Sequence, residues 1–158
     1  MPGNPRPTRR SILVMGAVSA LHAGTVFAAE EPVVTVHKDP DCGCCSGWVK
    51  HLQKAAFRTK VLETKDLDAV KKKLGVPDDL AACHTAEVSG YVIEGHVPAI
   101  ALRRFLNEKP TATGLAVPGM PIGSPGIEGG SPEQYEVILF GPAVKRSYMQ
   151  FVGEKALD

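Results

Sequence analysis

The hydrophobic and polar pattern of this chain first predicts a strand followed by a helix. Residues 33–36 are all β-branched and predict a short strand, which the turn residues 39–41 should end. Trp48, Leu52 and Ala55 then recur at the spacing of one helical face, so an amphipathic helix of about three turns is expected. The segment between the turn and Trp48 therefore opens this helix.

The pattern continues as an alternation of strands and helices. It predicts a strand at 58–63, a helix at 67–74, strands at 85–89 and 91–94 and a helix at 97–107. A closing hairpin is predicted from 135–140 and 145–151. Gly75 and Pro77 should end the second helix, and the sequence Gly141-Pro142 should turn the hairpin. This order predicts the α/β class, as a thioredoxin-like sandwich with an additional C-terminal β-hairpin.

Residues 1–28 have the pattern of an export signal. Three arginines precede an apolar run over 12–21, and small residues lead up to Ala28, where cleavage is expected. Two of the arginines are adjacent, as in twin-arginine signals. The run is short and rich in Gly and Ala, so no membrane span is expected after cleavage. We therefore expect a periplasmic protein whose residues 29–158 form a single domain.

Export changes the charge balance of the chain. The chain has 18 Lys and Arg, of which three lie in the leader, so 15 remain against 17 Asp and Glu, a net charge of −2. No basic patch interleaved with aromatic residues is apparent, and the lysines at 71–73 are interpreted as the solvated face of a short helix. Nucleic acid is therefore not an expected partner. His37 and His51 are also expected to be solvated.

Three of the four cysteines, Cys42, Cys44 and Cys45, lie within four residues at the start of the first predicted helix. Cys42 and Cys45 alone have the C-x-x-C spacing of a redox dithiol, but the third thiol can capture a mixed disulfide or bridge metal ions. The first turn of a helix favours the thiolate, which is both the nucleophile and the metal ligand. Two ordinary disulfides are the simpler alternative, although adjacent cysteines are awkward to pair.

The second half of the chain supplies candidate partners for these cysteines. Cys83 and His84 come just before the third predicted strand, where a thioredoxin-like fold brings a loop to the helix-borne cysteines. They are therefore expected to complete the site, with a buried inert cysteine as the alternative. Residues 114–126 hold four glycines and three prolines among apolar residues, which indicates a packed loop with a specific path. Its central Met120 offers a thioether suited to Cu(I), or only fills a gap in the packing.

Four separated motifs together resemble the CopG-like family of periplasmic copper-resistance proteins. They are Cys42 to Cys45, Cys83 to Thr85, Tyr91 to Pro98 and Gly114 to Gly126, and the resemblance covers nearly the whole mature chain. The resemblance implies a thioredoxin-like fold whose C-x-C-C cysteines hold copper as a multinuclear thiolate-bridged cluster. It also implies a role in copper redox conversion and detoxification.

The resemblance carries over to particular residues. The metal ligands that it implies are Cys42, Cys44, Cys45, Cys83, His84, His96 and Met120. His96 has the alternative role of capping or anchoring the following helix. Ile127 stands where a second methionine is expected after residues 124–126, so any contribution of that methionine to copper affinity is missing here.

Copper is the expected cargo, with several ions per chain and periplasmic copper-handling or redox proteins as partners. Cu(I) is soft and prefers thiolate, thioether and imidazole, and a mixed sulfur and nitrogen shell permits cycling between Cu(I) and Cu(II). Zinc is less favoured because Cys44 and Cys45 are adjacent, whereas zinc knuckles space their cysteines two to four residues apart. The sequence leaves open whether the protein is a copper oxidoreductase, a thiol–disulfide oxidoreductase using Cys42 and Cys45, or a non-catalytic copper chaperone.

Overall fold

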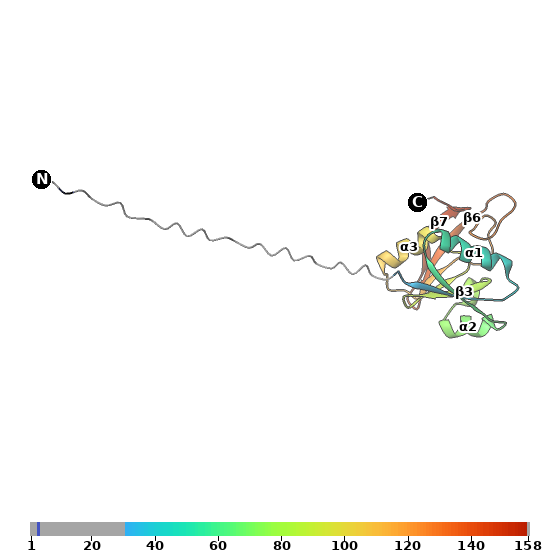
Figure 1. The fold of residues 1–158 in the computed structure, drawn as a ribbon. Coiled ribbons are helices and arrows are strands. Elements are labelled where there is room, and N and C mark those ends of the chain that lie inside the picture. Colours follow the sequence, from blue (N-terminus) through green and yellow to red (C-terminus); the bar gives the residue numbers. More distant parts are fainter. Residues whose placement is uncertain (1–2, 4–30, 158) are drawn as a thin grey trace.

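The computed structural model describes residue 3 and residues 31–157, so the predicted export signal and its cleavage site at Ala28 lie outside the described residues apart from Gly3 (Figure 1). The elements in chain order are β1 Val33–Lys38, α1 Gly43–Lys54, β2 Arg58–Glu63, α2 Leu67–Leu74, the 3-10 turn η1 Asp78–Leu80, β3 His84–Val88, β4 Tyr91–Glu94, α3 Ala99–Glu108, β5 Gly114–Ala116, β6 Gln134–Gly141, β7 Val144–Val152 and β8 Lys155–Ala156. Every strand and helix predicted from the pattern is present within a few residues of its expected bounds.

The strands form one eight-stranded sheet in the order β2-β1-β3-β4-β5-β6-β7-β8. β1 and β2 are parallel, and β3 is antiparallel to both β1 and β4. This part, with its βαβ unit and following hairpin, is the arrangement expected of a thioredoxin-like sandwich. β6 and β7 form the predicted additional hairpin, and the sheet covered by helices confirms the α/β class.

One segment expected as loop is a strand instead. Residues 114–116 form β5, which pairs parallel with β4 and antiparallel with β6. A Cβ at Gly114 would lie 1.7 Å from the backbone oxygen of Val92, so glycine is needed where the two backbones meet. β5 therefore joins the hairpin of β6 and β7 to the rest of the sheet. The sequence does not predict this strand, because it has only three residues and they show no alternation of hydrophobic and polar side chains.

Helices cover both faces of the sheet, as Figure 1 shows with α1 and α3 on one side and α2 on the other. The neighbouring residues Val92 and Ile93 of β4 show why. Ile93 belongs to the large core that contains residues of α1 and α3, whereas Val92 packs with Val76 and Leu80, which follow α2. Successive strand residues point to opposite faces, so a continuous apolar run is what a sheet covered on both faces requires.

Local sequence explains where α2 begins and ends. The Asp66 carboxylate accepts the Ala69 amide at 3.0 Å and so caps the first turn. Gly75 ends the helix in the left-handed region, at a φ of 73°. The expectation that the lysines at 71–73 are all solvated is wrong for Lys71, which is buried and ion-paired with Glu94, while its two neighbours are exposed.

The two histidines expected to be solvated also have partners. His37 Nε2 lies 2.8 Å from the Glu87 carboxylate across the β1–β3 pair. His51 on α1 is half-buried and its Nε2 accepts the Ala99 amide at 3.0 Å, which caps the first turn of α3. That helix begins after Pro98, whose own side chain makes no capping hydrogen bond, so the cap has to come from another element.

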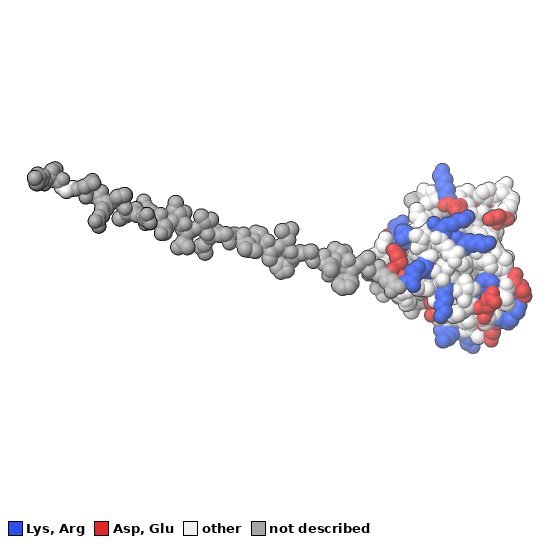
Figure 2. Space-filling model, viewed as in Figure 1, with Lys and Arg blue, Asp and Glu red and all other residues white. Residues whose placement is uncertain are grey.

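The surface carries both signs of charge. On the face shown in Figure 2, Lys and Arg side chains are interspersed with Asp and Glu. Among residues 31–157, no helix is both long and apolar enough to cross a membrane.

Candidate metal centre

The first turn of α1 presents its cysteines because the preceding turn is firmly held. Lys38 is buried, and its ammonium donates to the carbonyl oxygens of Asp39 and Pro40 at 2.9 and 3.3 Å. The Cys42 amide donates to Asp39 O at 3.1 Å, which closes the turn. Cys42 is the N-cap of α1, and its Sγ accepts the Cys45 amide at 3.3 Å. The sulfur thus occupies the place where free helix amides stabilise negative charge.

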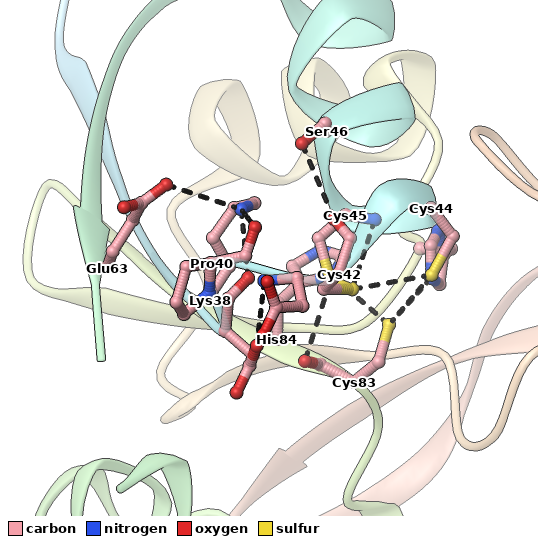
Figure 3. Close-up of a disulfide and its surroundings, with 12 residues drawn as sticks. Lys38, Pro40, Cys42, Cys44, Cys45, Ser46, Glu63, Cys83 and His84 are labelled. Carbon is pink, nitrogen blue, oxygen red and sulfur yellow. Dashed lines mark hydrogen bonds and ion pairs between the residues drawn. A yellow bond between two sulfur atoms is a disulfide. The ribbon is translucent and has the colours of Figure 1, made fainter. Parts of the chain in front are cut away.

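The structure brings all four cysteines together (Figure 3). Cys42 and Cys45 form a disulfide with their Cα atoms 5.4 Å apart. The Sγ of the free thiol Cys44 lies 3.5 Å from Cys42 Sγ and 3.8 Å from Cys83 Sγ. Cys83 comes from the loop before β3, as the fold class leads one to expect. The four sulfurs could therefore act on one ion or on a small group of ions.

Two imidazoles extend this sulfur group. Cys83 Sγ lies 2.9 Å from His96 Nε2 and 3.4 Å from His84 Nδ1. His96 Nδ1 lies 2.8 Å from the carbonyl oxygen of Pro125, which can only accept, so Nδ1 carries the proton. In the neutral ring, Nε2 is then the acceptor for the Cys83 thiol. Cys83 belongs both to the four-sulfur group and to a group formed with His84 and His96.

His84 is the least satisfied polar side chain of the site. It is fully buried, and among the described residues its Nε2 has no hydrogen-bond partner. Its ring centroid lies 4.4 Å from that of Trp48 and 4.9 Å from that of His96. The Trp48 indole is itself fixed by donating to Val97 O at 2.8 Å. An unpaired nitrogen in a buried site is costly. The ring nitrogen that faces Cys83 is Nδ1, so a metal ion beside the thiol would meet that atom.

Burial sets the protonation states of these groups. Burial, reinforced by Cys44, raises the pKa of the Cys83 thiol to about 12. Burial lowers the pKa of His84 well below its ordinary value, and it also lowers that of His96. At neutral pH the site therefore holds a thiol and two neutral imidazoles. A metal ion that binds to Cys83 has to displace a proton.

The glycine- and proline-rich loop predicted at 114–126 closes over the start of α1. Gly126 has a φ of 89°, and a Cβ there would lie 2.6 Å from both Cys44 O and Trp48 N. The carbonyl oxygen of the neighbouring Pro125 accepts from His96 Nδ1, so the path of the loop also fixes the orientation of this imidazole. Met120 lies on this loop with 58% of its surface exposed, whereas the four cysteines, His84 and His96 are all buried or half-buried.

Sequence reasoning missed a polar network behind the site. The fully buried Glu94 lies in hydrogen-bond contact with Lys71, Thr85 and the backbone amide of Ala82. A carboxylate that ends the apolar strand Tyr91–Glu94 was the available signal. Its partner Lys71 lies in a run of three lysines, so the sequence could not distinguish it from its solvated neighbours.

The fold and the donor set define a mixed α/β protein with a site of thiols and imidazoles suited to a soft metal ion. Two solved structures match it, "Copper resistance protein copG- Form 2" and "Copper resistance protein copG- Form 1". The first is 39% identical, covers 77% of this chain and 99% of its own, and has a TM-score of 0.73. The second is 42% identical, covers 75% and 98%, and has a TM-score of 0.67. The chain belongs to this family of CopG copper resistance proteins, which confirms the resemblance seen in the sequence.

The other comparisons add one match. The family model described as "Protein of unknown function, DUF411" matches residues 80–127, which include Cys83, His84 and His96 but not the cysteines of α1. No curated protein matches the chain.

Proposed function

We propose that this protein binds copper in the periplasm as part of copper resistance, and that it holds several ions in a copper–thiolate site. The observation that carries the proposal is the convergence of four sulfurs and two imidazoles, from α1, the loop before β3 and the segment after β4. Both solved relatives bear the name of a copper resistance protein. The proposal includes removal of residues 1–28 on export, which leaves residues 29–158 as one metal-binding domain.

The donor set fits copper better than harder ions. Thiolate and imidazole are soft and borderline ligands, and a bridging thiolate lets a few cysteines hold more than one Cu(I). The disulfide between Cys42 and Cys45 is the oxidised form of this site. A dithiol reductant, which is itself oxidised to a disulfide, supplies the two electrons and two protons that convert it into two thiols and so adds two sulfur ligands beside Cys44 and Cys83. In this proposal the reduced form is the one that loads copper fully.

Each proposed ligand has a distinct position. Cys42, Cys44 and Cys45 act from the first turn of α1, where free backbone amides stabilise thiolate. Cys83 joins them to the imidazoles of His84 and His96. In this proposal these nitrogen ligands let the site hold Cu(II) as well as Cu(I). The exposed thioether of Met120 is available to an arriving ion. Cycling between Cu(I) and Cu(II) at this mixed donor set is part of the proposal.

The deciding experiment measures metal content and free thiols together. Protein matured in the periplasm of copper-grown cells is purified without added metal or reductant, then analysed for metal and alkylated. We expect several copper ions per chain with the cysteines protected from alkylation. Cys42→Ser and Cys45→Ser should each abolish copper retention and copper resistance, because each removes a thiolate of the shared cluster. Full tolerance of both substitutions would refute the copper proposal.

A smaller substitution tests the link between the two donor groups. Cys83→Ala should change the copper stoichiometry, since Cys83 belongs to both groups. Met120→Ala is the companion variant, and a lower copper content there would place the thioether among the ligands. An unchanged count in Cys83→Ala would reduce Cys83 to core packing, and one zinc per chain in the parent protein would recast the site as structural.

The disulfide favours a second candidate, a thiol–disulfide oxidoreductase. Cys42 is partly exposed and could attack a substrate disulfide, while the buried Cys45 resolves the mixed disulfide. The free thiol of Cys44 lies 3.5 Å from Cys42 Sγ and would divert the exchange. Copper-free protein that catalyses the reduction of a model disulfide substrate by an added thiol, with its own Cys42–Cys45 disulfide reduced and re-formed in each turnover, would favour this candidate. A copper chaperone without turnover would instead hold copper of unchanged valence.

A further inference from the structure

A buried polar network lies behind Cys83, on the face of the sheet that α2 covers. The carboxylate of Glu94 accepts from Lys71 Nζ at 2.5 Å, from Thr85 Oγ1 at 2.6 Å and from the Ala82 amide at 2.6 Å. Lys71 Nζ also donates to Thr85 Oγ1 at 2.9 Å. Each of the three side chains is buried. Glu94, Lys71 and Thr85 thus hydrogen-bond to one another, and they connect α2 to β3, to β4 and to the loop that carries Cys83.

The positions of these contacts along the chain are informative. Ala82 immediately precedes Cys83, and Thr85 follows it by two residues, so one carboxylate binds a backbone amide before the thiol and a side-chain hydroxyl after it. On the same strand end, Gly95 N donates to His84 O at 3.0 Å and turns the chain from Glu94 to His96. Glu94 therefore fixes the relation between the two segments whose side chains, Cys83 and His96, meet at 2.9 Å.

Space around this strand end is tight. A Cβ at Gly95 would lie 2.5 Å from Val117 O and 2.7 Å from the Ala82 side chain, and the residue has a φ of 69°. The backbone at Gly95 thus approaches the loop at Ala82 closely, with no room for a side chain between them. Because Ala82 is the residue next to Cys83, we expect a loosening of the Ala82–Glu94 contact to shift Cys83 as well.

A buried ion pair is a poor device for stability alone. Removing a carboxylate and an ammonium from water is costly, and apolar side chains of similar size often stabilise a core as well or better. Such pairs are better suited to fixing one arrangement of the backbone, since each hydrogen bond has a required direction. Here the arrangement that is fixed is that of the Cys83 loop.

We propose that Glu94, together with Lys71 and Thr85, is a positioning residue that holds Cys83 against His96 and so sets the geometry of the sulfur–imidazole pair. The consequence of this positioning role for metal binding rests on the proposed copper function. The primary test of the positioning role does not, because that test uses metal-free protein.

The test compares the two free thiols of the disulfide-bonded, metal-free protein. Cys44 and Cys83 are alkylated under native conditions, and the ratio of their rates is measured by peptide mass spectrometry. Thr85→Val keeps the shape of the side chain and removes its hydroxyl, and Lys71→Met removes the ammonium. Lys72→Met is the matched control, since it makes the same substitution one residue along α2 at an exposed lysine.

We expect Thr85→Val and Lys71→Met each to raise the Cys83 to Cys44 rate ratio by roughly tenfold, the equilibrium factor for one charge-assisted hydrogen bond. Lys72→Met should leave the ratio at its parent value, and Thr85→Ser should restore it. An unchanged ratio in Thr85→Val overturns the proposal. Equal acceleration of both thiols overturns it too, because the network then only stabilises the fold.

The consequence for the metal site is measured separately with Cu(I). Reduced protein is titrated anaerobically with Cu(I) against a chromophoric chelator. Thr85→Val should weaken the binding that depends on Cys83 by roughly tenfold, and Thr85→Ser should restore it. Parent protein that binds no copper but shows the expected alkylation ratios would refute the copper function while supporting the positioning role. If the parent protein binds copper, and Thr85→Val changes neither the Cu(I) affinity nor the alkylation ratio, the copper function is supported and the positioning role is refuted.

Discussion

Cys83 is the residue on which the two donor groups of this protein depend. It contacts Cys44 on one side and His96 on the other, and it comes from a loop rather than from the helix that holds the other cysteines. Its thiol is partly buried, so its charge state is governed by desolvation rather than by a cation beside it. The neighbouring imidazole of His96 is neutral and accepts a hydrogen bond from the thiol, so the pair stays uncharged unless a metal ion replaces the thiol proton.

The pH dependence of Cys83 alkylation tests this description. Because its pKa is raised to about 12, the thiolate fraction is small and should grow roughly tenfold per pH unit from pH 7 to 10 without a plateau. The rate is measured on metal-free, disulfide-bonded protein. In urea the same cysteine should titrate near its ordinary value. A plateau below pH 9 in the native protein would contradict the raised pKa.

At the scale of elements, the site lies where four segments meet. α1 and its N-cap supply three cysteines, the loop before β3 supplies Cys83, the first residue of β3 is His84, and the segment after β4 supplies His96. The loop after β5 then packs on α1 through Gly126. A Cβ at Gly47 would likewise lie 2.9 Å from the Gly126 Cα, so the two backbones touch with no side chain between them. This contact holds Pro125, and with it His96, over the cysteines.

Gly126→Ala should therefore disturb the site from a distance. The added Cβ would be 2.6 Å from Cys44 O and Trp48 N, at a φ that side chains rarely adopt. We expect a loss of about 2–4 kcal/mol in the free energy of unfolding, from overpacking and backbone strain together. Urea denaturation measures this loss, and a lower copper content is expected beside it.

Gly129→Ala is the matched control. Gly129 has a similar φ of 97°, but a Cβ there would meet nothing within 4 Å. Only the strain remains, so the loss should be about 1 kcal/mol with no change in copper content. Equal losses for the two variants would show that the contact with α1 is not what matters.

At the scale of the whole molecule, the buried His84 and His96 and the half-buried His51 link stability to pH. Burial lowers the pKa of His51, His84 and His96 below that of the unfolded chain. The unfolded state therefore binds more protons below about pH 6.5, so their contribution to stability is present above that pH and is lost as the pH falls. His51 also accepts the Ala99 amide through its neutral Nε2, so protonation would break the cap of α3.

We expect the free energy of unfolding to fall from pH 7.5 to pH 5, by up to about 1.4 kcal/mol per pH unit for each proton taken up. His51→Gln should reduce this slope, because glutamine can still accept the Ala99 amide but does not titrate. Urea denaturation of the metal-free protein at several pH values measures both slopes. The raised pKa of the buried Glu94 increases stability as the pH falls, which opposes the effect of the histidines. This contribution is the same in the parent protein and in His51→Gln, so it cancels when their two slopes are compared. Equal slopes would contradict the role given to His51.

Local patterns in the sequence are enough to predict the order of elements, the fold class, the family and the crowding of cysteines at the start of α1. Those features are local, because β-branched runs, helical spacing, turn residues and adjacent thiols each span only a few residues. Other features appear only in the folded chain: Cys83 lies 3.8 Å from Cys44 and 2.9 Å from His96, residues 114–116 are a strand, and Lys71 is buried against Glu94. These features depend on which segments meet across the sheet. Lysines at 71, 72 and 73 are identical in sequence, and only packing against β3 and β4 makes one of them part of the site's support.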